Sequence, residues 1–217
     1  MDKLRILVAH DKLAISRAIQ QVLGTYGFSV DPMSDGDAVV EALGKGRYDG
    51  LVIDAALPGA PIHEICELAK SSEHPVPAVI TIAAIFRRRS YRRRPSNLYG
   101  ADDIVEVHRI AGELPAKLWR LFSGKGLDAA AKAEAEMALW SLRNEPSRGP
   151  KRLAGLLVAG LILDRADEVA DADDLSCLHR ILDDDLEQVS ALLVGLMGDS
   201  GHEKAVRTSF QAIAGSG

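Results

Sequence analysis

The stretch "LRILVAHDKLAISRAI", residues 4–19, joins a strand to a helix and indicates the fold. Its apolar run at residues 6–9 is typical of a short buried strand, and apolar residues recur at helical spacing from Leu13 onward. His10 and Asp11 lie between the two elements. Because open α/β sheets bind ligands beyond the carboxyl ends of their strands, we expect these two side chains to lie at a site.

The alternation of strand and helix continues to residue 122. Five strands connected by helices through short loops predict a doubly wound, five-stranded parallel α/β sheet with helices on both faces. The expected strands are residues 4–9, 28–31, 50–53, 77–82 and 102–107, and the expected helices are 12–24, 36–45, 61–71 and 112–122.

Asp54 closes the third predicted strand, "DGLVID", and is expected to lie in one crevice with Asp11. Two carboxylates at a strand-end crevice can hold Mg²⁺, which prefers oxygen ligands. The motifs "ILVAHDK", "YDGLVIDAALPG" and "YGADDIVEV" follow the first, third and fifth strands at the separations found in a response-regulator receiver domain. On these motifs, residues 4 to about 122 resemble that family and are similar to the chemotaxis response regulator.

The resemblance implies the flavodoxin-like strand order 2-1-3-4-5, phosphorylation of Asp54 by a histidine kinase, and Mg²⁺ held by Asp11, Asp54 and the Ala56 carbonyl. Three of the five side chains that the resemblance implies for the phosphorylation pocket are replaced in this sequence. The chain has His10 for the first acid, Ile82 for the hydroxyl residue and Val107 for the lysine, and His108 stands where a proline is usual.

These replacements predict a remodelled pocket that binds Mg²⁺ weakly and is poorly phosphorylated at Asp54. Two interpretations of the histidines stay open. His10 is either a tolerated polar residue at an unused pocket, or it forms a pH-sensitive site with His108.

An arginine cluster within "FRRRSYRRRP", residues 86–95, follows the fourth strand. It is a candidate for partner binding, with an acidic protein surface favoured over simple solvation and over nucleic acid. The candidate residues are Arg87, Arg88, Arg89, Tyr91, Arg92, Arg93 and Arg94.

Past residue 123 no strand pattern appears, and acidic residues outnumber basic ones. We expect a receiver-like domain at 1–123, a linker at 124–127 and an all-α domain at 128–217, with helices at 128–144, 150–169, 172–197 and 201–214. The second of these helices is apolar nearly all round, which places it inside a bundle. The third has an apolar stripe that predicts a homodimer seam. The seam residues are Leu175, Leu178, Leu182, Val189, Leu192 and Leu196.

Composition is that of an ordinary globular protein: 217 residues, 47% hydrophobic, 26% charged, with a net charge of −5. No apolar run is long enough to span a bilayer and no signal segment is expected, so we predict a cytoplasmic protein. Nucleotide loops, nucleophile elbows and zinc spacings are not found in the sequence, which predicts a signalling protein rather than an enzyme.

The leading hypothesis is an atypical response regulator acting through protein contacts. The alternatives are a conventional two-component phospho-switch and a nucleic-acid-binding regulator.

Overall fold

The computed structural model describes residues 3–83, 99–124, 149–170, 172, 175–197 and 202–214. The arginine cluster at 87–94 and the helix expected at 128–144 lie outside these residues. The strands are β1 Arg5–Ala9, β2 Ser29–Met33, β3 Gly50–Asp54, β4 Ala78–Ala83 and β5 Asp103–Glu106. The helices are α1 Leu13–Thr25, α2 Gly36–Lys45, α3 Ile62–Ser71, the 3-10 turn η1 Val107–Arg109, α4 Ile110–Gly124, α6 Gly149–Asp164, α7 Ala166–Val169, α8 Leu175–Met197 and α9 His202–Ala214.

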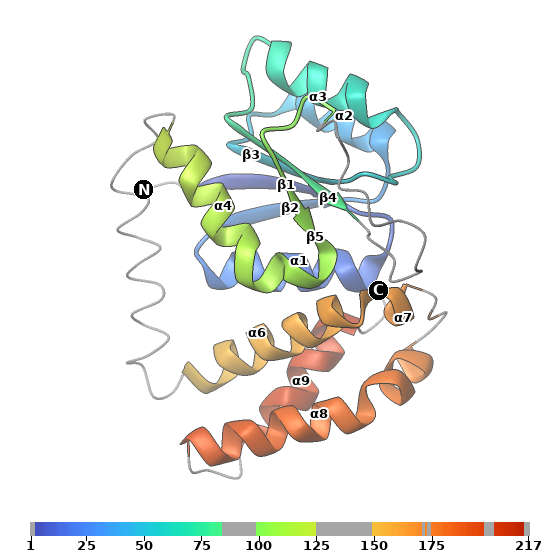
Figure 1. Ribbon diagram of the computed structural model, residues 1–217, viewed down its shortest axis with the longest axis vertical. Helices are drawn as coiled ribbons and strands as arrows, with labels where there is room; N and C mark the ends of the chain where they lie inside the picture. Colours follow the sequence, from blue (N-terminus) through green and yellow to red (C-terminus); the bar gives the residue numbers. More distant parts are fainter. Residues whose placement is uncertain are drawn as a thin grey trace.

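The five strands form one parallel sheet in the order β2-β1-β3-β4-β5 (Figure 1), which confirms the predicted doubly wound fold. Its register places Ala9 beside Ile53 and Asp54 beside Ile82. The carboxyl ends of β1, β3 and β4 therefore meet at one edge of the sheet, where ligands bind in open α/β folds.

One helix boundary follows from a local capping signal, and two other boundaries differ from the prediction. Asp35 caps α2, because its carboxylate accepts a hydrogen bond from the Ala38 N–H at 2.8 Å. The fifth strand is shorter than predicted because Val107 begins the 3-10 turn, so the following helix starts at Ile110. The single helix expected at 150–169 is divided at Arg165 into α6 and α7.

Two apolar cores lie on opposite faces of the sheet, because successive strand residues point to opposite sides. One core packs β1 residues Leu7 and Ala9 against α2 and α3. The other contains Ile6 and Val8 and continues through α1 and α4 into the C-terminal helices. The C-terminal helices thus share a continuous hydrophobic core with one face of the sheet.

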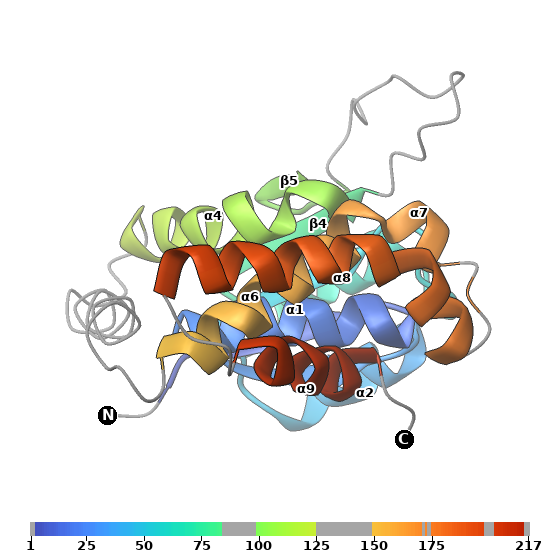
Figure 2. The ribbon, with the colours of Figure 1, turned by 90° about the horizontal axis from the view of Figure 1, so that it is seen from below.

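Helix α6 lies between α1 and α4 on one side and α8 and α9 on the other (Figures 1 and 2). It approaches α1 closely at Gly155, where an added Cβ would lie 2.5 Å from Nε2 of Gln21. Buried residues occur around much of its circumference, as its sequence predicts: Ala154, Val158, Ala159, Ile162 and Leu163. Here the apolar helix is covered by the sheet's own helices as well as by its C-terminal neighbours. The predicted division with a linker at 124–127 stays a prediction, since residues 125–148 are outside the described part.

Part of the predicted dimer seam on α8 is buried in the core of a single chain. Leu178 and Leu182 are 5% and 0% exposed and belong to the core of a single chain, so they are not available to a second copy. Val189 is half-buried against the same core, whereas Leu192 is 51% exposed. The side chains of Leu175 and Leu196 are outside the described set. The six residues therefore do not form one outward stripe, and dimerisation stays a prediction.

Candidate functional site

Three polar side chains meet at the carboxyl ends of β1 and β3. His10 follows β1, where its backbone N–H donates to the Met33 carbonyl at 3.0 Å, and Asp54 is the last residue of β3. His10 and Asp54 are only 6% and 4% exposed, while Asp11 is open to solvent. Each residue offers one ligand atom, and these three atoms lie within 4.8 Å of one another. The predicted convergence of Asp11 and Asp54 is thereby found, with His10 as a third member.

The His10 ring stands between the two carboxylates. Its Nδ1 lies 3.3 Å from Asp11 Oδ1, and its Nε2 lies 3.9 Å from Asp54 Oδ2. Nδ1 also accepts a hydrogen bond from the Lys12 backbone N–H at 3.0 Å. In a neutral ring this bond places the proton on Nε2, facing Asp54. The distance from Nε2 to Asp54 is too long for a hydrogen bond.

Burial dominates the electrostatics of this pair. It lowers the pKa of His10, while the nearby charges of Asp54 and Asp11 oppose that change. Burial also raises the pKa of Asp54, which the charge of His10 when protonated and the Ala56 N–H, 3.2 Å from Oδ1, partly offset. His10 is therefore neutral at pH 7, because its ordinary pKa already lies below 7.

The two apolar replacements are core residues. Ile82 is fully buried beside Asp54 in the sheet register, and Val107 is 5% exposed at the start of η1. Both belong to the hydrophobic core that includes Val158 and Ile162 of α6, and η1 itself contacts α6. Thr81 does not replace the missing hydroxyl. It points to the opposite face from Ile82, and its buried Oγ1 has no hydrogen-bond partner among the described residues.

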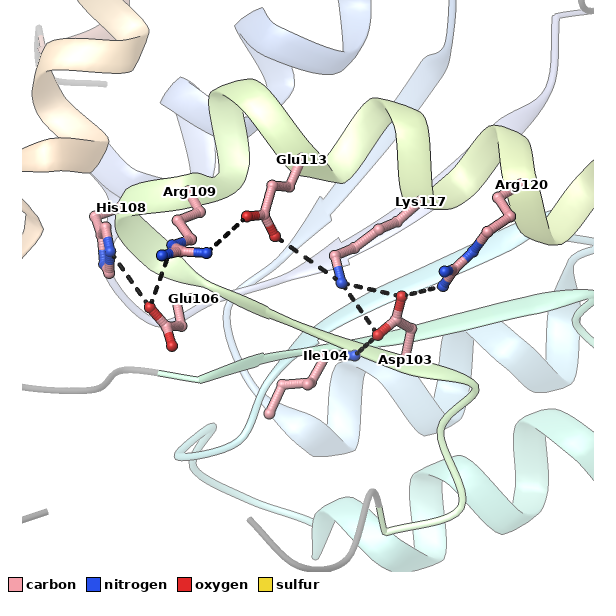
Figure 3. Close-up of polar contacts among 8 residues, drawn as sticks. All are labelled: Asp103, Ile104, Glu106, His108, Arg109, Glu113, Lys117 and Arg120. Carbon is pink, nitrogen blue, oxygen red and sulfur yellow. Dashed lines mark hydrogen bonds and ion pairs between the residues drawn. The ribbon is translucent and has the colours of Figure 1, made fainter. Parts of the chain in front are cut away.

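His108 is directed to β5 rather than to the crevice. Its Nε2 lies 3.3 Å from Glu106 Oε2, to which Arg109 Nε also approaches at 3.6 Å (Figure 3). Of the two histidines that the sequence pairs in one site, only His10 belongs to the cluster of possible ligands.

The acids of the "GADD" motif have structural roles that the sequence analysis did not find. Asp103 accepts hydrogen bonds from Lys117 at 3.1 Å and from Arg120, which fixes α4 against β5 (Figure 3). Asp102 accepts from the Val79 N–H at 2.8 Å and from Lys70, which joins α3 to the sheet. For Asp103, the basic residues on the helix that follows are a sequence signal that could have indicated this contact.

The donor set fits Mg²⁺ only weakly. Asp11 and Asp54 supply carboxylate oxygens, but the third side chain is an imidazole, and Mg²⁺ requires oxygen ligands in near-octahedral geometry. The proton on Nε2 also faces the region between His10 and Asp54. The weak Mg²⁺ binding expected from the sequence is consistent with this arrangement.

A doubly wound sheet of this strand order, with carboxylates at the ends of its first and third strands, defines a receiver-like α/β fold. Its sequence relatives are response regulators, which confirms the predicted resemblance. The chain is 27% identical over 157 residues to the response regulator MprA of Mycobacterium ulcerans, covering 69% of this chain and 66% of that protein. MprA of Mycobacterium bovis is 28% identical over 155 residues, with the same coverage. The chain thus spans just under two thirds of the length of these relatives.

The receiver domain of Francisella response regulator 1452 is a structural neighbour at 22% identity and a TM-score of 0.49, covering 57% of this chain and 99% of that one. The response regulator TrrA of Thermotoga maritima, solved with Mg²⁺ and BeF, has 23% identity and a TM-score of 0.47, covering 54% and 98%. No family model matches the sequence. None of the helices in the described ranges is both long and apolar enough to cross a membrane.

Proposed function

We propose that this protein is an atypical response regulator: a non-enzymatic signalling protein whose receiver-like crevice does not operate as a conventional phospho-switch. The observation that carries the proposal is the burial of Ile82 and Val107. At the positions where the resemblance implies a hydroxyl and a lysine, both are buried in a core shared with α6. A buried isoleucine and valine offer a phosphoryl group no hydrogen-bond donor and no charge.

The packing of the C-terminal helices supports output through protein contacts. Helix α6 packs against α1, α4 and η1 in a hydrophobic core that they share. Its small residues allow close packing, as at Gly155. We assign the output to another protein, recognised by a surface that this helical packing presents.

The competing function is a conventional two-component switch, phosphorylated on Asp54 by a histidine kinase. The Ala56 N–H bond to Asp54 and the exposed Asp11 favour it, since both features suit a carboxylate that receives a phosphoryl group. Against it stand the low exposure of Asp54 and the loss of a metal-binding acid at His10. Nucleic-acid binding rests on arginines 87–94, for which the described residues supply no support.

The two functions predict different responses to Mg²⁺ and beryllofluoride, a phosphoryl mimic that TrrA holds together with Mg²⁺. For the wild-type protein we expect millimolar Mg²⁺, with or without beryllofluoride, to leave the thermal melting temperature unchanged. His10→Asp restores a carboxylate and is expected to tighten Mg²⁺ binding roughly tenfold or more, so that Mg²⁺ raises the melting temperature.

His108→Asp is the matched control, because His108 contacts Glu106 and is not one of the clustered ligands. It should respond to Mg²⁺ as the wild type does. A clear beryllofluoride-dependent rise in the melting temperature of the wild type, abolished by Asp54→Asn, would instead support the conventional switch.

A further inference from the structure

The outward surface of α8 is divided along its length into an acidic half and an apolar half. Helix α8 lies on the side of the C-terminal helices that faces away from the sheet (Figure 1). Its earlier turns expose Asp183, Asp184 and Glu187, and the helix has no charged residue after Glu187. Its later turns expose Leu192 and Val194, whose side chains are 51% and 41% exposed.

The apolar half is one continuous area rather than two isolated side chains. Leu192 and Val194 lie about 160° apart around the helix, and Ala191 and Gly195 occupy the arc between them. Both small residues are exposed, and an added Cβ at Gly195 would have no described atom within 4 Å. The backbone of a partner can therefore approach closely over the small residues, between the two larger side chains. Contiguous exposed apolar areas are a feature of interaction sites.

The acidic half continues the same line along the helix. Asp183 and Glu187 lie within about 40° of Val194 around the helix axis. Asp183 lies 3.4 Å from Nδ1 of His179, whereas Asp184 and Glu187 form no ion pair among the described residues. A partner that covers the apolar half therefore also meets carboxylates that are available to pair with its cations.

We propose that this outward surface of α8 is the docking site for the partner protein, and that the partner presents a helix with an apolar half and a basic half. The inference rests on the proposed output through protein contacts, and it names the surface and the chemistry of the partner. This surface, the α8 face, consists of Asp183, Asp184, Glu187, Ala191, Leu192, Val194 and Gly195.

A second copy of this chain is a poorer occupant of the α8 face. In a parallel pair of α8 helices, Asp183, Asp184 and Glu187 would lie against their own copies, and like charges across an interface repel. In an overlapping antiparallel pair, the same carboxylates would lie against Leu192 and Val194, where they would lose water without gaining a partner. A helix with lysines or arginines opposite the carboxylates avoids both costs. Charge complementarity therefore favours a basic, partly apolar helix.

Fluorescence anisotropy of a labelled synthetic peptide tests the α8 face in the full-length protein. The probe is an amphipathic helical peptide with leucines in one half and lysines in the other, titrated at an ionic strength of about 0.15 M. The control peptide has glutamates in place of the lysines. We expect the wild-type protein to bind the lysine peptide roughly tenfold more tightly, or better, than the glutamate peptide.

Substitutions on and away from the α8 face locate the binding. Glu187→Lys reverses a charge in the acidic half and should weaken binding of the lysine peptide roughly tenfold. Val194→Asn removes an apolar contact and should also weaken it. Glu67→Lys is the matched control, because Glu67 is exposed on α3, which packs on the other face of the sheet. It makes the same change in net charge and should leave the affinity unchanged. Circular dichroism verifies that each variant is folded, as expected for exposed positions.

Equal weakening by Glu187→Lys and Glu67→Lys would show attraction to net charge alone and overturn the proposal. Failure of the lysine peptide to bind, or equal binding of both peptides, would do the same. A wild-type dimer in sedimentation that Val194→Asn dissociates would assign the α8 face to a second copy instead. The titration contains neither Mg²⁺ nor a phosphodonor, so its failure would remove the α8 face and leave the test of the phospho-switch unaffected.

Discussion

Replacing Leu182 by Asp is expected to unfold the C-terminal helices. Leu182 is 0% exposed in the core that α8 shares with α6 and α9. Removing a buried leucine side chain alone costs about 2–5 kcal/mol. A carboxylate at the same position is also deprived of water without a partner, which raises the total loss of unfolding free energy to about 4 kcal/mol or more.

Denaturant unfolding followed by circular dichroism measures this effect. Leu192→Asp is the matched control, since Leu192 lies on the same helix and is 51% exposed. Its unfolding free energy should stay within about 0.5 kcal/mol of the wild-type value. If Leu182→Asp kept wild-type stability and only dissociated a dimer, the leucine would face a second chain and the intrachain core described here would be wrong.

Gly36→Val is expected to disturb the loop that follows Asp54. A Cβ at Gly36 would lie 2.6 Å and 2.7 Å from the backbone oxygen and nitrogen of Ala60. Backbone atoms cannot turn aside as a flexible side chain can, so either α2 or the loop between β3 and α3 must move. We expect a loss of about 3 kcal/mol of unfolding free energy, at the upper end of the range for overpacking.

Gly44→Ala, on the same helix, provides the contrast for this prediction. No atom lies within 4 Å of its added Cβ, and alanine favours a helix over glycine by about 0.5–1 kcal/mol. Chemical denaturation should therefore show the two substitutions changing stability in opposite directions. A Gly36→Val protein as stable as Gly44→Ala would mean that α2 and the loop are not in close contact.

The sheet was predictable because its signals are local and repeated. Buried apolar runs alternate with amphipathic segments from Leu4 to Phe122, and this pattern implies parallel strands whose carboxyl ends share an edge. The meeting of Asp11 and Asp54 follows from that topology alone.

The face of α8 was less predictable because a seven-residue spacing drifts around a helix with 3.6 residues per turn. Leu192 lies about 80° around the helix from Leu182, whereas Leu193 returns to within about 20° of it. The structure accordingly buries Leu193 and exposes Leu192. The packing of α6 against α1 and α4 likewise joins segments that lie far apart in the sequence, and hydrophobic periodicity does not predict such contacts.

The contacts that the crevice side chains make could not be predicted from the sequence either. The sequence indicates that His10 lies at a strand end, but not that its Nδ1 meets the Lys12 N–H while Nε2 faces Asp54. In the same way, the place of Ile82 at the end of the fourth strand was predictable, but its inclusion in a core with Val107 of η1 and with α6 was not.

Intact-mass spectrometry of the full-length protein, incubated with a small-molecule phosphodonor and Mg²⁺, tests the central claim most directly. The unmodified mass should persist in the wild type, because the crevice lacks one metal-binding acid and presents buried Ile82 and Val107 where the phosphoryl partners are expected. A receiver domain that retains the usual five side chains serves as the positive control for the donor. Near-complete addition of one phosphoryl group to the wild type, lost on Asp54→Asn, would contradict the account.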